Sequence, residues 1–114
     1  MLTLENLNAM GADTAEGLAR CYGNETLYLR LVKMLPAESN FDTLKSSLEQ
    51  GDLDTAFQAA HALKGVVGNL SITPMYKLAS EITELLRARA QADYMPLVNE
   101  MLAIRDHLAA LCKD

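Results

Sequence analysis

Residues 52–71 read DLDTAFQAAHALKGVVGNLS, and this stretch decides the fold. Its apolar residues recur at steps of three and four, which is the pattern of a helix that turns one face toward a core. An aspartate at position 52 or 54 can cap the N-terminus of such a helix. The spacing therefore predicts a core-facing helix whose buried stripe consists of Ala56, Ala60, Leu63, Val67 and Leu70.

His61 belongs to this helix but not to its apolar stripe. Adjacent residues of a helix lie about 100° apart, so the imidazole is rotated away from Ala60. Lys64, Gly65 and Gly68 follow His61 by three, four and seven residues and share its flank. A helical glycine costs roughly 1 kcal/mol relative to alanine, so local stability does not explain two of them. The glycines instead predict a flank without bulky side chains, on which a large reactant can approach the imidazole.

A lysine one turn from the imidazole indicates that the site binds an anion. A phosphoryl group carries about two negative charges at neutral pH, and the ammonium group of Lys64 would compensate them. Taken singly, a helical histidine is more often a partly buried polar group, and small helical residues more often permit close helix packing. Because the histidine, the lysine and the glycines coincide on one flank, we favour a functional site over these structural explanations.

The run His61-Ala62-Leu63-Lys64-Gly65, continued by Gly68-Asn69-Leu70, resembles the signature of histidine-containing phosphotransfer (Hpt) domains of two-component phosphorelays. A weaker resemblance covers most of the chain, through Ala12-Asp13, Gly17-Leu18-Ala19-Arg20, Gly23, Tyr28 and Leu78-Ala79. One departure is Ser71, which stands where the family often has glycine. Serine also suits a turn, so we expect this departure to affect the helix end and not the chemistry.

The resemblance implies a role for each residue of the flank. It implies that His61 is phosphorylated on Nε2, that Lys64 supports the phosphoryl charge and that Gly65 leaves steric access for a partner; we expect Gly68 to widen that access. The chain would then accept a phosphoryl group from a receiver-domain aspartate and pass it to another receiver. The implied partners are response-regulator receiver domains, including that of a hybrid sensor kinase.

Phe57 lies one turn before His61 on the same flank. An aromatic residue there is either part of an apolar docking rim around the imidazole or simply part of the core. The sequence leaves both interpretations open.

The chain lacks the sequence signals of a kinase that uses ATP. It contains no phosphate-binding G-x-x-x-x-G-K-[ST] loop and no kinase glycine loop, so we expect no ATP-dependent kinase activity of its own. No acidic cluster surrounds the site, so we expect no cofactor on this chain and Mg²⁺ on the receiver partner. The dimerisation domain of sensor kinases is a poorer match, because that family has an acidic residue after the histidine and a downstream proline, where this chain has Ala62 and Val66.

A competing hypothesis from another class is a non-catalytic helical interaction module. Such a protein would use the same helix face to bind a signalling partner without being phosphorylated. A degenerate adaptor of this kind is expected to have lost His61 or to have filled position 65, and this chain has done neither.

Length and charge limit the remaining possibilities. The 114 residues fit one Hpt-like domain over positions 1–114, and a net charge of −5 argues against a nucleic-acid surface. No apolar run approaches the ~20 residues of a membrane span and no signal peptide is recognisable, so we expect a cytoplasmic protein with no membrane contact. We expect a monomer, because no apolar helix face lacks a partner. Met1 and the length favour a free-standing protein over a domain excised from a hybrid kinase.

The cysteines and the second histidine suggest no further site. Cys21 and Cys112 form no C-x-x-C pattern, so we expect reduced thiols. His61 and His107 stand 46 positions apart without a compact group of other ligands, so we predict no metal, and we interpret His107 as a surface residue.

The rest of the chain predicts further helices and no strand. Asp13 can cap a brief helix through Arg20, with Glu16 completing a capping box. A helical pattern over residues 25–50 is interrupted by Pro36, and its apolar stripe is Leu27, Leu31, Met34, Leu35, Phe41, Leu44 and Leu48.

Two more helices are expected after the site helix. One starts with Thr73 as N-cap and Pro74 as first residue, and the other follows a cap at Asp93. Together these elements predict an all-α protein, an up-down four-helix bundle with a short N-terminal helical segment.

Overall fold

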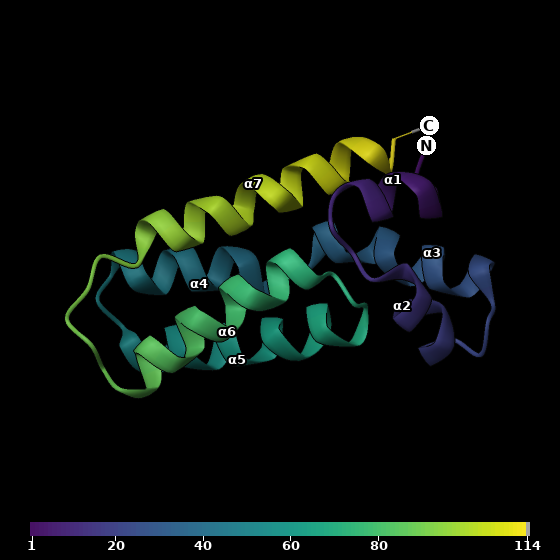
Figure 1. Cartoon of the computed structure of the whole chain (residues 1–114). Helices are drawn as coiled ribbons and strands as arrows, with labels where there is room; N and C mark the ends of the chain where they lie inside the picture. The colour runs from purple at the N-terminus through teal and green to yellow at the C-terminus, as the bar shows by residue number, and fades with distance from the viewer. Residues whose placement is uncertain (114) are drawn as a thin grey trace.

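The structure is a computed structural model that describes residues 1–113, and it is built from α-helices (Figure 1). Among these residues there is no strand, and the predicted all-α class is confirmed. The elements in chain order are α1 (Leu4–Ala9), α2 (Thr14–Arg20), α3 (Glu25–Met34), the 3₁₀ helix η1 (Leu35–Ala37), α4 (Asn40–Glu49), α5 (Leu53–Asn69), α6 (Thr73–Arg87) and α7 (Met95–Leu111).

The last four helices form the bundle. Helix α4 contacts α5 and α7, α5 contacts α6, and α6 contacts α7, so the four close on one another around a common core. The short connections at residues 50–52 and 70–72 reverse the chain direction. In Figure 1 the four helices lie side by side along the long axis of the molecule, which runs from left to right, and successive helices point in opposite directions. The predicted four-helix bundle is confirmed. In the same view α1, α2 and α3 lie at one end of it.

The helical pattern over residues 25–50 is divided at Pro36, as the sequence predicted. Proline removes a backbone donor and its ring clashes with the preceding turn, so α3 ends at Met34 and α4 begins only at Asn40. The predicted stripe of α3 is correct for Leu27, which is half-buried against the core, but wrong for Leu31 and Met34, because the fully buried residues are Tyr28 and Val32. Since the break uncouples α3 from the phase of α4, α3 is free to turn a different face inward, and it leaves Leu31 and Met34 exposed.

Side-chain caps fix where the predicted helices start. The Asp52 carboxylate accepts the Thr55 N–H at 3.1 Å and the Thr55 hydroxyl at 2.6 Å, so α5 starts at Leu53. These hydrogen bonds from Thr55 hold the pKa of Asp52 below its usual value. Asp13 caps α2 by accepting the Glu16 N–H.

The starts of α6 and α7 differ by one residue from the sequence prediction. Thr73 is the first helical residue of α6 and not its cap. The cap position is held by Ile72, whose side chain is fully buried, so core packing and not a side-chain hydrogen bond fixes this start. At α7 the Asp93 carboxylate accepts the Met95 N–H at 3.1 Å, although the residue at the cap position is Tyr94.

The core of the bundle lies against the face of α5 that the sequence predicted to be buried. All five residues of the predicted α5 stripe are buried, and they pack with residues from every other helix of the bundle. The fully buried partners include Phe41 and Leu44 of α4, Met75 and Ile82 of α6, and Met101 and Leu108 of α7. The opposite flank of α5 is thereby left on the surface.

Candidate functional site

The four residues singled out from the sequence lie on the surface flank of α5. His61 and Gly65 are exposed, and Lys64 and Gly68 are half-buried, while the stripe on the other side of the helix is buried. This agrees with the rotation about the helix axis that the spacing predicted. His107 is exposed on α7 and belongs to no such group.

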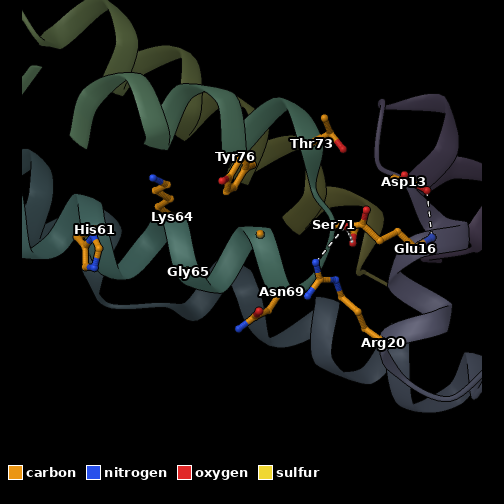
Figure 2. Close-up of a pocket in the computed structure, with 11 residues that line it drawn as sticks. Asp13, Glu16, Arg20, His61, Lys64, Gly65, Asn69, Ser71, Thr73 and Tyr76 are labelled. Atoms are coloured by element: carbon orange, nitrogen blue, oxygen red, sulfur yellow. Dashed lines mark hydrogen bonds and ion pairs between the residues drawn. The ribbon is translucent and has the colours of Figure 1, made fainter. Parts of the chain in front are cut away.

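All four residues line one surface cleft with a volume of about 630 Å³. Its second wall is formed by α6, including Tyr76, and its far end by Glu16 and Arg20, which reach from α2 toward the end of α5 (Figure 2). Sequence reasoning missed this contribution of α2. Glu16 was interpreted only as part of a cap and Arg20 only as part of a resemblance, because no spacing rule relates either residue to His61.

The two glycines have different surroundings. A Cβ atom at Gly65 would meet no heavy atom of the described residues within 4 Å beyond its own chain neighbours and helix backbone, so packing among residues 1–113 does not require glycine there. A Cβ atom at Gly68 would lie 3.1 Å from two ring carbons of Tyr76, which is a tight contact. Packing of Tyr76 is therefore a sufficient reason for Gly68, whereas Gly65 opens onto free space.

The imidazole of His61 stacks against the ring of Phe57. The two ring centroids are 5.9 Å apart and the planes are inclined by 20°. Phe57 is half-buried, and the guanidinium carbon of Arg87 lies 5.1 Å from its centroid. Within residues 1–113 no hydrogen bond holds either nitrogen of the imidazole. The sequence had left Phe57 as either rim or core, and the structure adds a direct contact with His61.

Lys64 carries the cation nearest to His61 in the sequence. In the described part of the chain it makes no ion pair, so its ammonium group is available to an incoming anion. The two carboxylates of the cleft are engaged elsewhere. Asp13 caps α2, and Glu16 binds Arg20 at 3.4 Å and the Ser71 hydroxyl at 2.9 Å.

The Ser71 corner attaches α2 to the end of the site helix. Ser71 has a φ of +58°, a left-handed conformation that favours glycine, and its side chain is buried. Its hydroxyl donates to Glu16, and its carbonyl oxygen accepts the Asp13 N–H at 2.9 Å. The expected capping box of α2 is therefore incomplete, because the Glu16 carboxylate binds Ser71 instead of the Asp13 N–H. Ser71, which stands where the family often has glycine, thus binds α2 to the end of α5 that borders the cleft.

Neither a metal cluster nor a membrane span is found in the described residues. No group of three His, Cys, Asp or Glu side chains over residues 1–113 is placed to hold a metal ion. None of the helices in this range has the length and apolar character needed to cross a membrane. Cys21 is a buried free thiol.

Comparison with known proteins decides the family. The family model of the Hpt domain matches residues 36–114, which is more than half of the chain. The chain belongs to the Hpt domain family. Hpt domains act in phosphotransfer in two-component systems and interact with receiver domains. No curated protein and no solved structure gives a significant match. The matched range contains the whole bundle of this Hpt domain, while α1, α2 and α3 precede it.

Proposed function

We propose that this Hpt domain is a phosphorelay intermediate that accepts a phosphoryl group on His61 from a receiver aspartate and passes it to a second receiver. The observation that carries the proposal is a combination on one face of α5: an exposed imidazole, a lysine one turn away that makes no ion pair within residues 1–113, and open space at Gly65. Phosphoryl transfer between proteins requires this chain to supply a nucleophile, a compensating cation and room for the partner.

The proposed transfer is a displacement at phosphorus. The lone pair of His61 Nε2 attacks the phosphorus atom of an aspartyl phosphate, and the new N–P bond forms as the P–O bond to the carboxylate breaks. The bonding electrons leave with the aspartate carboxylate, and the proton on Nδ1 stays on the ring. Passing the group on reverses these steps with a second receiver. The acidic residues and Mg²⁺ that assist the reaction are expected on the receiver, so this chain needs no cofactor.

Lys64 and Gly65 support the same step in different ways. The ammonium group of Lys64 compensates the charge of the phosphoryl group during transfer. Gly65 admits the receiver backbone next to the imidazole, because a larger side chain there would project into the space that the aspartate must cross. We assign Gly68 a lesser part in access, since its neighbour Tyr76 already occupies part of that space.

The proposal extends to the partners and the setting of the reaction. The donor would be the receiver of a hybrid sensor kinase, and the acceptor a response-regulator receiver. We propose that the domain acts as a monomer in the cytoplasm, without contact to membrane or nucleic acid. Its net charge of −5 is consistent with the last point.

Phosphoryl transfer from labelled receivers tests the proposal. Receiver domains from the source organism are charged with radioactive phosphate, purified and mixed with the protein. Acid-labile, base-stable label is expected on the wild type and on the control variant His107→Gln, whose imidazole is exposed on another helix. His61→Gln should take up none while retaining its helical signal and melting temperature. Label that persists on His61→Gln would assign the phosphorylation to another residue.

The same experiment separates the proposal from the alternative of a non-catalytic interaction module. If the wild type binds receivers but never acquires label, and His61→Gln binds equally well, the module interpretation is correct. Affinity is measured by titration with unphosphorylated receivers and with receivers carrying a stable phosphate mimic.

A further inference from the structure

The imidazole of His61 is held by an aromatic ring where a hydrogen bond would be expected. Histidines that handle protons or metals are usually oriented through the second ring nitrogen, which donates to a carboxylate or a backbone carbonyl. Within residues 1–113 neither nitrogen of His61 has such a partner. The contact that restrains the ring plane is the stack with Phe57, at 5.9 Å between centroids and 20° between planes.

The stack follows from the helix itself. Phe57 and His61 are separated by four residues of α5, so their side chains lie one above the other on the same face. An interplanar angle of 20° makes the two rings nearly parallel, and a centroid separation of 5.9 Å lies within the range of offset aromatic stacking. Rotation of the imidazole about χ1, or a turn about χ2 that tilts its plane, would break this arrangement.

Arg87 of α6 lies over the ring of Phe57. Its guanidinium carbon lies 5.1 Å from the Phe57 centroid, and its Nε donates to Glu84 Oε2 at 3.3 Å. Arg87 is the last residue of α6, so it connects the end of that helix to the ring on α5. The result is a layered group, the Arg87–Phe57–His61 stack, that spans two helices of the bundle.

We propose that Phe57 is a positioning residue for phosphoryl transfer at His61 and that Arg87 holds Phe57 in its stacking position. This inference rests on the proposed function of His61. An unrestrained imidazole on a helix would spread over about two χ1 wells and, in each, over a broad range of χ2, whereas the stack favours one χ1 well and one ring plane. Loss of the stack should therefore slow transfer about two- to fourfold, because a smaller fraction of the molecules is ready to react.

Replacement of Phe57 tests the positioning role. Phe57→Leu keeps an apolar side chain but removes the aromatic plane, and Phe57→Tyr keeps the plane. Single-turnover transfer is measured with the phosphorylated receiver at saturating concentration, and receiver affinity is measured separately. Phe57→Leu should lower the transfer rate at saturation about two- to fourfold with little change in affinity, and Phe57→Tyr should restore it.

A spectroscopic measurement reports on the ring itself. The proton resonances of the His61 imidazole are shifted by the neighbouring aromatic ring, and NMR should show this shift lost in Phe57→Leu and retained in Phe57→Tyr. Leu102→Ala is the control, because Leu102 is half-buried against the core on α7, away from the helix that carries His61 and Phe57. Leu102→Ala should lower the melting temperature but leave both the His61 resonances and the transfer rate unchanged.

Arg87 is tested by a pair of variants. Arg87→Gln should slow transfer about twofold, because Phe57 can still stack on His61 but no longer has a guanidinium group over its ring. Arg87→Lys should restore the rate.

Two results overturn the inference. If Phe57→Leu transfers at the wild-type rate while its affinity falls, Phe57 is a docking residue, and if only its melting temperature falls, Phe57 is a core residue. Both results leave label on wild-type His61 intact, so they are distinct from a failure of the proposed function, in which no variant is labelled.

Discussion

The buried hydroxyl of Tyr28 donates a hydrogen bond to the carbonyl oxygen of Leu70 at 2.8 Å, across 42 positions of the chain. Leu70 caps the C-terminus of the site helix, where backbone carbonyls lack partners within the helix. The bond therefore attaches α3, which precedes the matched Hpt range, to the end of the helix that carries His61. Two predictions concern this attachment.

The first is a pH dependence of stability. Burial raises the pKa of Tyr28 from 10.0 to about 12, because the charged phenolate loses solvation in the core. The unfolded chain therefore releases this proton near pH 10 and the folded chain near pH 12, so the stability that Tyr28 contributes is complete below pH 10 and is lost as pH rises toward 12. A difference of this size corresponds to roughly 2 to 3 kcal/mol.

Urea titrations of the wild type and Tyr28→Phe measure this effect. At pH 8 the variant should be less stable by about 1 kcal/mol, the usual contribution of one hydrogen bond. Between pH 9.5 and 11.5 the wild type should lose this advantage and then become the less stable protein, because the titration costs more than the hydrogen bond contributes, while other titrating groups affect both proteins equally. Parallel stability curves across that range would mean that the Tyr28 phenol titrates alike in both states.

Gly17→Ala should destabilise the fold although Gly17 lies in a helix. A Cβ atom there would overlap the Tyr28 ring, and the ring is fully buried, so it has no free space into which to move. Overpacking of this kind typically costs 1 to 3 kcal/mol, more than the roughly 1 kcal/mol that alanine gains in helix propensity. Thermal melts of Gly17→Ala and of the double variant with Tyr28→Leu measure the cost. The smaller leucine should relieve the clash, and equal losses from Gly17→Ala in both backgrounds would remove the ring as its cause.

The sequence predicted what depends on neighbours along the chain. Asp52 caps α5, Pro36 divides the helical pattern and His61 faces outward, because each follows from spacing within one helix or one turn. Features that depend on contacts between helices could not be predicted from the sequence. The burial of Val32 in place of Leu31 depends on how α3 turns after the break.

At the candidate site, too, the sequence predicted the residues that share one helix but not the contacts between helices. Lys64 and Gly65 were found because they lie three and four residues from His61 on one helix. The bond from Ser71 to Glu16 joins residues 55 positions apart, and the cation over Phe57 comes from the far end of α6. No periodicity in the chain marks such pairs, so the far end of the cleft and the support of the imidazole became visible only in three dimensions.

Lys64→Ala should slow transfer more than it weakens docking. Lys64 is half-buried and makes no ion pair in the described residues, so screening by solvent limits its direct contribution to receiver binding to about 1 kcal/mol or less. During transfer the same charge acts on a phosphoryl group at the imidazole, where it is most effective. Lys77→Ala, which removes an exposed lysine from α6, is the control. A collapse of receiver affinity with an unchanged rate at saturation would make Lys64 a docking residue.

Gly65 separates stability from function, because the two requirements act in opposite directions. Beyond its own helix backbone and chain neighbours, no atom of the described residues lies within 4 Å of a Cβ atom at this position, so Gly65→Ala should stabilise the fold by up to about 1 kcal/mol through helix propensity. Gly65→Gln should cost little stability for the same reason. Both variants place atoms where the receiver must approach, and a displacement of ~1 Å can slow transfer on the order of 100-fold.

Gly68→Ala provides the matched comparison on the same helix. Its Cβ atom would meet the Tyr76 ring at 3.1 Å, so part of the propensity gain is lost in moving that ring, and the stabilisation should be smaller than at Gly65. Thermal melts and receiver-to-His61 transfer rates on the three variants give both quantities. If Gly65→Ala loses stability and transfers normally, glycine is required there for packing and the access role must be given up. A variant that is more stable than the wild type and slower in transfer would show that the surface at residue 65 is kept open for the partner at the expense of the helix.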